Sequence, residues 1–275
     1  MDQTKFTSLI VTYNSAHEIS DLLVDLRMCA PSCPVIVVDN ASQDQTVDMI
    51  RGQFPEVLLI RNLQNLGYAR GVNQGFDHSS TEYVFVLNPD IRIPGPQVIT
   101  AMLGCLENSP QVGAVGPLQF TVEEKMPGIK FNCSHWGLRT FGVYLSYQLH
   151  HNWSSTQPIQ TPLINAGCMF LRRSAYEQIG RINPKYFLYG EDPDLCLKLR
   201  RYGYECWLLP NVHVIHYRQR SLHTVPRRER LCIRWQAIWN IGDAFLTGWW
   251  RIFLDNLTGN RPNGNRLKSR GWQNL

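Results

Sequence analysis

The stretch EYVFVLNPDIRIPG, residues 82–95, decides the fold class. It contains an uninterrupted apolar and aromatic run, Tyr83 to Leu87, which stops at Asn88-Pro89-Asp90. A run of this length and type is typical of a strand buried on both faces of a parallel sheet. Asp90 would therefore lie at the carboxyl end of such a strand, where ligands bind in open α/β sheets.

Strand-like and helical stretches alternate on both sides of this run. Apolar runs predict strands at 8–12, 35–39, 57–61 and 112–117, and apolar spacing predicts helices over 17–29, 45–53, 69–78 and 96–108. This alternation indicates an α/β fold with a mainly parallel, Rossmann-like sheet flanked by helices. After an irregular stretch over 121–160, we expect a strand at 166–173 and a short helix opened by a capping box at 174–177. A helix over 191–203 and two closing strands, 205–210 and 212–217, would follow.

The composition is that of a globular chain, with 44% hydrophobic and 18% charged residues among 275. The N-terminus lacks the basic, apolar, small-residue order of a signal peptide, which predicts a cytoplasmic protein. The eight cysteines form no CxxC unit, so we predict reduced thiols and no zinc site.

Positive charge is concentrated at the C-terminal end. Residues 217–275 contain 11 Lys and Arg against 3 Asp and Glu, a net +8, whereas residues 1–216 contain 16 against 19, a net −3. A basic tail favours an anionic partner, either a phospholipid surface or a nucleic acid. Because no recognised nucleic-acid-binding module accompanies it, we predict no nucleic-acid partner.

The segment 232–257 is apolar and aromatic, and four charged residues, Arg234, Asp243, Arg251 and Asp255, interrupt it. Its uncharged runs are shorter than the ~18 residues of a membrane-spanning helix. The mixture of Trp and Arg fits a helix lying on a membrane surface. Packing on the rest of the chain, or on a second copy, is an equally open interpretation.

Polar residues follow four of the predicted strands: Thr12-Tyr13-Asn14, Asp39-Asn40, Asn62 to Asn65, and Asn88-Pro89-Asp90. Ordinary turn chemistry explains each of them singly. Four such ends in one sheet favour a shared ligand site. The chain lacks G-x-G-x-x-G after its first strand and lacks G-x-x-x-x-G-K-[ST], which argues against a dinucleotide-binding dehydrogenase and a P-loop enzyme.

An ordered succession of motifs identifies a family. The motifs are IVTYNS (10–15), VIVVDNASQDQT (35–46), RNLQNLGYARGVNQG (61–75), VLNPDI (86–91), INAGCMFLRR (164–173), YGEDPDLCLKLRRYGY (189–204) and LPNVHVIHYRQRS (209–221). In order and spacing they resemble the family 2 glycosyltransferases, inverting enzymes of the GT-A fold, and especially their rhamnosyltransferase-like members. The resemblance implies a GT-A catalytic domain over 1–216, with a nucleotide-sugar half over about 1–118 and an acceptor half over about 119–216. Residues 217–275 would form a basic, aromatic, helical extension.

The resemblance implies a divalent metal, Mg²⁺ or Mn²⁺, at Asn88-Pro89-Asp90. Hard cations of this kind prefer carboxylate and phosphate oxygens. Asp90 would ligate the metal, whereas Asn88 is neutral where a second carboxylate is common, so we expect weaker metal affinity. His216 matches a histidine that completes the metal site in several relatives, and an ordinary core or surface histidine is the alternative.

The resemblance also implies a nucleotide pocket. Asp39 would hydrogen-bond the pyrimidine ring, and Thr12 and Asn14 would lie near the base and ribose. Arg70 is either a diphosphate ligand or a solvated helix arginine. The full set expected to bind the nucleotide sugar is Thr12, Tyr13, Asn14, Asp39, Asn40, Asn65, Gly67, Arg70, Asn73, Asn88 and Asp90.

The acidic cluster Glu191-Asp192-Pro193-Asp194 has two interpretations. Pro193 suits the first turn of a helix, so Asp192 is a plausible N-cap. The resemblance makes Asp192 instead the base that takes a proton from the acceptor hydroxyl, and makes Glu191 and Asp194 acceptor-binding residues. A carboxylate can act in this way only within hydrogen-bond reach of the hydroxyl.

These implications combine into one functional expectation. The chain would transfer a sugar, with L-rhamnose from dTDP-rhamnose as the best single choice and a UDP-linked donor still open. The acceptor would be a saccharide or a lipid-linked saccharide of cell-surface polysaccharide synthesis, reached at the inner face of the plasma membrane. The alternative is a catalytically inactive GT-A module that binds a sugar nucleotide or a saccharide. Oligomeric state is left open.

Overall fold

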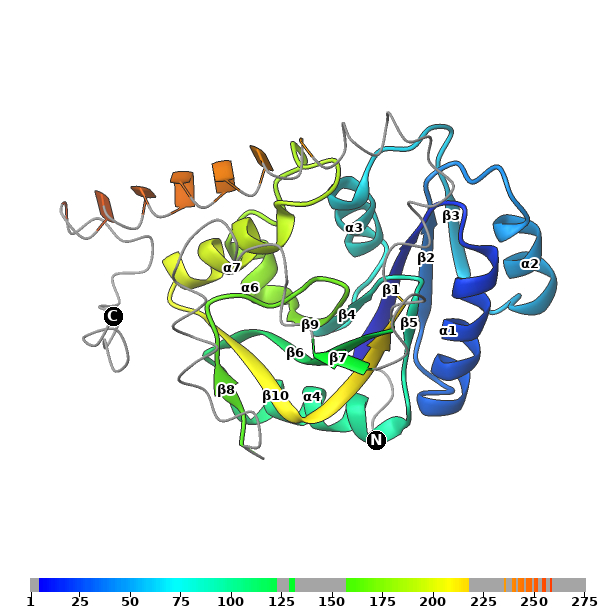
Figure 1. The fold of residues 1–275 in the computed structure, drawn as a ribbon, viewed down its shortest axis with the longest axis horizontal. Coiled ribbons are helices and arrows are strands. Elements are labelled where there is room, and N and C mark those ends of the chain that lie inside the picture. Colours follow the sequence, from blue (N-terminus) through cyan, green and yellow to red (C-terminus); the bar gives the residue numbers. More distant parts are fainter. Residues whose placement is uncertain are drawn as a thin grey trace.

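The computed structural model describes residues 5–122, 129–131 and 157–217, together with helical positions between 235 and 258. Ten strands of these residues form one sheet, with helices on both of its faces (Figure 1). The α/β fold class predicted from the sequence is confirmed. The sheet runs without a break across position 118, because β6 spans it.

The sheet has the strand order β3-β2-β1-β4-β9-β6-β10-β5, with β7 paired to β6 and β8 paired to β10. The strands are β1 (Phe6–Thr12), β2 (Val35–Asp39), β3 (Leu58–Arg61), β4 (Tyr83–Leu87), β5 (Ile91–Arg92), β6 (Val112–Val122), β7 (Ile129–Phe131), β8 (Ile159–Gln160), β9 (Cys168–Arg172) and β10 (Glu205–His216). The first four are parallel to one another, and β10 is parallel to β6. Strand β9 runs antiparallel between β4 and β6.

Among the helices described within residues 5–217, three lie on each face of the sheet. One apolar cluster joins the sheet to α1 (Ala16–Cys29), α2 (Thr46–Gln53) and α4 (Pro96–Asn108). The other joins it to α3 (Tyr68–Asp77), α6 (Arg173–Gln178) and α7 (Glu191–Arg201). In β1, Ile10 belongs to the first cluster and its neighbours Leu9 and Val11 belong to the second. Alternate side chains are thus buried on opposite faces, which is why the middle of the strand, residues 9–11, is apolar without interruption.

The position of β9 brings distant residues to the end of β4. Because β9 is antiparallel to β4, Cys168 pairs with Leu87, and the first residues of β9 lie at the carboxyl end of β4. The pairing continues one step further, where the Asn88 N–H donates to the Gly167 carbonyl at 2.8 Å. The segment just before β9 therefore joins the strand ends of the N-terminal half.

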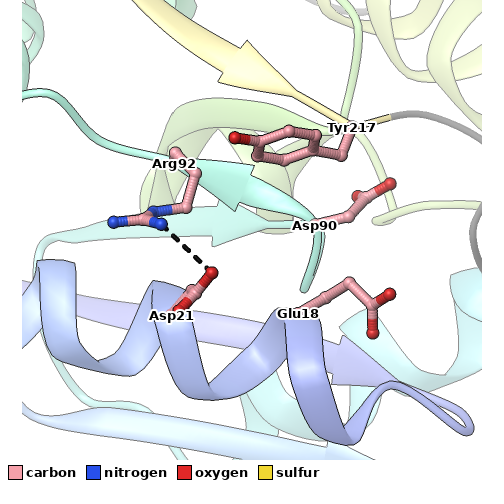
Figure 2. Close-up of a pocket in the computed structure, with 5 residues that line it drawn as sticks. All are labelled: Glu18, Asp21, Asp90, Arg92 and Tyr217. Atoms are coloured by element: carbon pink, nitrogen blue, oxygen red, sulfur yellow. Dashed lines mark hydrogen bonds and ion pairs between the residues drawn. The ribbon is translucent and has the colours of Figure 1, made fainter. Parts of the chain in front are cut away.

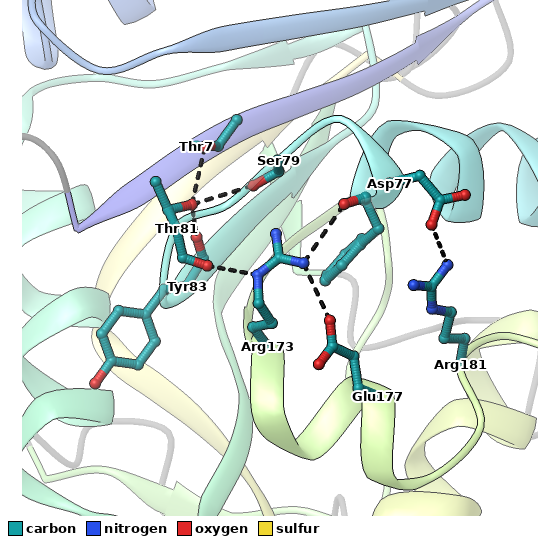
Figure 3. A network of polar contacts seen from close by, with 9 residues as sticks. Thr7, Asp77, Ser79, Thr81, Tyr83, Arg173, Glu177 and Arg181 are labelled. Atoms are coloured by element: carbon teal, nitrogen blue, oxygen red, sulfur yellow. Dashed lines mark hydrogen bonds and ion pairs between the residues drawn. The ribbon is translucent and has the colours of Figure 1, made fainter.

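A polar network at the opposite end of β4 ties the two halves of the sheet together (Figure 3). Arg173 donates from Nε to the Thr81 carbonyl at 2.6 Å and pairs with Glu177 at 3.2 Å. Close by, Arg181 pairs with Asp77 at 2.6 Å. These contacts fix α6 against α3 and β4.

Three local predictions are wrong. The two expected closing strands are one strand, β10, and an irregularity in its pairing with β6 between Leu209 and His213 accommodates Pro210, which has no N–H to donate. The capping box at 174–177 does not form, because α6 begins at Arg173 directly after β9 and its N-cap residue, Arg172, makes no side-chain cap bond. Asp192 is not an N-cap, because α7 begins at Glu191 and its N-cap position is Gly190.

Candidate active site

Asp90 and His216 form the centre of the site. Asp90 lies in the turn between β4 and β5, and His216 is the last residue of β10. Antiparallel pairing of β5 with β10 places His216 opposite Ile91, so the Asp90 Oδ1 and His216 Nε2 atoms lie 3.2 Å apart. Both side chains are buried.

A second side chain fixes the orientation of the His216 ring. His216 Nδ1 lies 3.0 Å from Gln119 Oε1, and the Gln119 amide nitrogen donates to the Asn165 carbonyl at 3.3 Å. The Gln119 oxygen therefore faces the ring and accepts a hydrogen from Nδ1, which leaves Nε2 of a neutral imidazole without a proton. In that tautomer of the neutral ring, Nε2 would face a carboxylate oxygen with its lone pair, and a cation between the two atoms would relieve their repulsion.

This donor set fits Mg²⁺ or Mn²⁺. Carboxylate oxygen suits both ions, imidazole nitrogen suits Mn²⁺ in particular, and a buried hydrogen bond to the second ring nitrogen is the usual support of a metal-binding histidine. Within the described ranges, no group of three or more His, Cys, Asp or Glu side chains is placed to hold a metal. Asp90 and His216 would thus leave most coordination positions to oxygens of a ligand.

Gly167 allows the side chains around His216 to converge. A Cβ atom at this position would lie 2.7 Å from His216 Cε1, 2.7 Å from Asn165 Oδ1 and 3.2 Å from Asn88 Nδ2. Any larger residue would displace them. No role was predicted for Gln119, Asn165 or Gly167, although Asn165 and Gly167 lie in the INAGCMFLRR motif.

The acidic cluster at the start of α7 adjoins the same segment. The Ala166 N–H donates to Asp192 Oδ1 at 3.0 Å, and the Tyr68 hydroxyl donates to the Ala166 carbonyl at 2.9 Å. Residue 166 therefore connects α3 to the candidate base. Tyr68 was another position without a predicted role.

The three carboxylates of this cluster differ in exposure. Asp192 is partly exposed, whereas Glu191 and Asp194 are buried. Asp194 pairs with Lys198 at 2.8 Å. Burial raises the pKa of the Glu191 carboxyl well above its usual range, and the Asp192 carboxylate raises it further. Of the three, Asp192 is the carboxylate that reaches solvent.

Two buried polar atoms at the ends of β1 and β2 have no hydrogen-bond partner among the described residues. They are the Thr12 hydroxyl and the Asp39 Oδ1 atom. Thr12 and Asp39 pair in the parallel register, so these atoms lie on adjacent strand ends. The other Asp39 oxygen accepts the Ser42 N–H at 3.1 Å. Because buried polar atoms are normally paired, this pair of orphans indicates a polar ligand.

The neighbouring predicted residues shape the loops around this pair. Asn14 Oδ1 accepts the Gln43 N–H at 2.7 Å, which ties the loop after β1 to the loop after β2. Asn40 donates to the Gly67 carbonyl at 3.2 Å, and Asn65 Oδ1 accepts the Gly67 N–H at 2.9 Å. Tyr13 is exposed beside them.

Gly67, Arg70 and Asn73 lie where α3 meets the segment 182–187. Gly67 has a φ of 84°, and a Cβ there would lie 2.6 Å from the Phe187 carbonyl oxygen. Both polar atoms of the Asn73 side chain have protein partners, the Ile182 carbonyl and the Tyr176 hydroxyl. Arg70 is exposed and makes a long contact, 3.4 Å, to the Pro184 carbonyl. These contacts assign Asn73 a positioning role, while nucleotide binding by all three residues stays a prediction.

A cavity of about 170 Å³ adjoins Asp90 (Figure 2). Its lining residues are Glu18, Asp21, Asp90, Arg92 and Tyr217. Arg92 is already neutralised, because it pairs with Asp21 at 3.1 Å and with Asp25 at 2.8 Å. Among the residues that line the cavity, the three carboxylates of Glu18, Asp21 and Asp90 outnumber the single cation of Arg92, and this negative charge favours a cation there.

Comparison with known proteins identifies the chain. Residues 7–180 match the sequence model of glycosyl transferase family 2. The chain belongs to this family. The family 2 glycosyltransferase is accordingly an enzyme, and its sheet and flanking helices are those of the GT-A fold, as the sequence predicted.

Two curated relatives of this family 2 glycosyltransferase are named as sugar transferases. An N-acetylglucosaminyl-diphospho-decaprenol L-rhamnosyltransferase of Mycobacterium tuberculosis is 26% identical over 265 residues, covering 89% of this chain and 86% of the relative. A hexosyltransferase of low-salt glycan biosynthesis from Haloferax volcanii is 27% identical over 214 residues, covering 76% of this chain and 66% of the relative.

Solved structures confirm the fold. A mannosyltransferase from Pyrobaculum calidifontis, in complex with GDP-Man and Mn²⁺, superposes with a TM-score of 0.61 at 20% identity, covering 94% of this chain and 66% of that one. GalNAc-T7, solved with UDP, GalNAc and Mn²⁺, gives a TM-score of 0.61 at 13% identity, covering 79% and 44%. Enzymes of this fold are thus seen with a divalent metal and a nucleotide or nucleotide sugar.

Proposed function

We propose that this glycosyltransferase transfers L-rhamnose from dTDP-rhamnose, with inversion at C1, to a lipid-linked saccharide used in cell-surface polysaccharide synthesis. One observation supports this proposal most: three features lie at or beside strand ends of one sheet. They are the buried Thr12 and Asp39 atoms without a described partner, the Asp90–His216 pair and the partly exposed Asp192. The rhamnosyl and lipid-linked specificity is supported by the name of the mycobacterial relative.

The donor would be held first by its nucleotide. Asp39 Oδ1 and the Thr12 hydroxyl have no partner in the part of the chain that the structure describes, so the first would accept a hydrogen bond from the N–H of a pyrimidine ring and the second would donate or accept one. The paired loops that follow β1 and β2, joined through Asn14 and Gln43, would enclose the base and ribose.

Asp90 and His216 would hold Mg²⁺ or Mn²⁺ against the diphosphate. When bound, the ion supplies positive charge that offsets the negative charge developing on the departing diphosphate. Gln119 and Asn165 keep the His216 ring in the orientation that this binding needs. Asn88 would contribute a neutral amide beside them, so we expect the metal site to have modest affinity.

Asp192 would act as the general base. Its Oδ1 atom accepts the Ala166 N–H, which orients the carboxylate, and the side chain is partly exposed, so an acceptor hydroxyl would reach it from solvent. As the hydroxyl oxygen bonds to C1 from the face opposite the diphosphate, the C1–O bond to the diphosphate breaks. The hydroxyl proton passes to Asp192, and the nucleoside diphosphate leaves.

The decisive experiment is a donor and acceptor screen with the purified chain. We expect Mn²⁺-dependent stabilisation in thermal-shift assays by dTDP-rhamnose and transfer of rhamnose to a lipid-diphosphate-linked saccharide. A preference for UDP sugars would overturn the donor assignment. Transfer to soluble saccharides, with none to the lipid-linked acceptor, would overturn the acceptor assignment.

A further inference from the structure

The described residues between 235 and 258 are helical and carry an exposed apolar side. Five large side chains are exposed there, to fractions of 64% at Trp235, 72% at Trp239, 67% at Leu246, 60% at Trp250 and 39% at Leu254. These positions are separated by four or seven residues, the spacing at which side chains share one side of a helix. We call this side the aromatic face.

The other side of the same segment packs on the catalytic body. The Asn240 amide nitrogen donates to the Leu188 and Tyr189 carbonyls at 3.3 and 3.1 Å. Ala244 is fully buried, and Gly248 lies against Leu197 of α7. Figure 1 shows the segment, in orange, next to α7. The aromatic face is therefore held in place by the opposite side of its own helix.

Both acidic residues that follow Glu229 in the sequence, Asp243 and Asp255, are used in this packing. Asp243 pairs with Lys185 and accepts the Tyr186 hydroxyl at 3.1 Å. Asp255 accepts two hydrogen bonds from Arg201, the longer at 3.0 Å. The carboxylates of the segment are thus neutralised against the body, while Arg251 remains exposed.

We infer that the aromatic face docks on an anionic phospholipid bilayer. Trp side chains favour the boundary between headgroups and acyl chains, and cationic side chains are attracted to anionic headgroups. Residues 217–275 carry a net +8, which suits this partner and opposes pairing with a second, equally charged copy. Among the described helices, none is both long and apolar enough to cross the bilayer, so the contact would be with its surface.

The helix that carries the aromatic face also contacts the chain just before the candidate base, Asp192. Asn240 binds the carbonyls of residues 188 and 189, immediately before Gly190 and the first turn of α7, which contains Asp192. Docking would therefore hold the start of α7 at a fixed place relative to the membrane. The docking inference rests on the proposed function for its biological purpose. A lipid-linked acceptor presents its saccharide at a membrane surface, and docking would bring the candidate base to that surface.

Vesicle flotation of the full chain, without donor or acceptor, tests the inference. We expect binding to vesicles of equal parts phosphatidylglycerol and phosphatidylcholine, weaker binding to pure phosphatidylcholine, and loss of binding as salt is raised. The double variant Trp239→Ser/Trp250→Ser should bind about tenfold more weakly or worse, because two interfacial aromatic side chains are lost. Met28→Ser, which removes an exposed apolar side chain of α1, is the matched control and should bind as the wild type does.

The outcomes separate docking from catalysis and from folding. Equal melting temperatures of the wild type and the double variant would show that the fold is kept, and single variants replace the double variant if it melts early. Undiminished vesicle binding by folded variants would overturn the inference, and so would wild-type protein that fails to bind anionic vesicles. A wild-type dimer that these substitutions convert to monomer, without a change in vesicle binding, would overturn it in favour of a second copy. Because no sugar donor is present, inactivity towards dTDP-rhamnose would not alter any of these results.

Discussion

Asp192 is joined to Ala166 by a hydrogen bond of 3.0 Å from the Ala166 N–H to the carboxylate. The bond connects the first turn of α7 to the segment before β9, which in turn contacts the end of β4. A backbone N–H thus holds a partly exposed carboxylate next to the strand ends. The predictions below concern this arrangement and the site around it.

Asp192→Asn should lower kcat about a thousandfold, since general-base catalysis typically contributes 10²–10⁴. The asparagine keeps the shape of the side chain but cannot take the acceptor proton. Donor affinity, measured by calorimetry with dTDP-rhamnose and Mn²⁺, should be unchanged. Asp48→Asn, an exposed carboxylate on α2, is the control and should retain full activity. An active Asp192→Asn enzyme would remove Asp192 from the base role.

Tyr68→Phe should lower kcat by roughly fivefold, because loss of one hydrogen bond of about 1 kcal/mol loosens residue 166, which positions Asp192. The Tyr68 hydroxyl donates to the Ala166 carbonyl and is not expected to touch either substrate. The pH dependence of kcat should therefore shift, while the KM for the donor stays constant. A uniform loss of activity with an unshifted pH profile would point to general loosening of the fold instead.

Removal of divalent metal with a chelator should abolish transfer, and Mn²⁺ or Mg²⁺ should restore it. Asp90→Ala and His216→Ala should weaken Mn²⁺ binding, measured by electron paramagnetic resonance in the absence of substrate, since each removes a predicted ligand. Gly167→Ala should weaken it as well, because the added methyl group would lie 2.7 Å from His216 Cε1. Wild-type Mn²⁺ affinity in all three variants would contradict the site.

Thr12→Val should weaken donor binding without destabilising the free enzyme. The Thr12 hydroxyl is buried and has no partner among the described residues, so its replacement by a methyl group removes an unsatisfied polar atom. We expect an equal or higher melting temperature without ligand, and a smaller thermal shift with dTDP-rhamnose. A lower melting temperature without ligand would mean that the hydroxyl has a structural partner.

Glu191→Gln should stabilise the protein at neutral pH. Burial raises the pKa of Glu191 in the folded state, so folding favours its protonated form. The wild type is then most stable below the pKa of the unfolded glutamate, about 4.3, and loses stability as the pH rises from there towards the folded-state pKa. The variant lacks this loss, so its melting temperature should exceed that of the wild type at pH 7 by a few degrees, about 2–4 °C.

The difference between Glu191→Gln and wild type should shrink as the pH is lowered towards 4. Glu177→Gln, which changes an exposed carboxylate of α6, should show no such pH-dependent gain. A variant that is less stable than wild type at pH 7 would show that Glu191 is charged and satisfied in the fold.

Local sequence pattern was sufficient for most of the fold. The apolar runs within β1, β2 and β4 indicate burial on both faces of the sheet, and the helical spacing of apolar residues in α1, α2 and α4 indicates a single buried face. The pattern failed where a neighbour overrides the local signal. Pro210 reads as a strand end, yet pairing with β6 carries β10 past it. Ser174 reads as a cap, yet α6 starts one residue earlier, because β9 leads directly into it.

For the site, sequence and structure contributed different kinds of information. The motif order placed polar residues at strand ends and named Asp39, Asp90, Asp192 and His216, because residue type and spacing are properties of the chain itself. Tertiary structure decided two further points. It showed which carboxylate of Glu191-Asp192-Pro193-Asp194 reaches solvent, and which side chain orients His216. Burial and contact join residues distant in sequence, such as Gln119 with His216 and Tyr68 with Ala166, and no local pattern records such pairs.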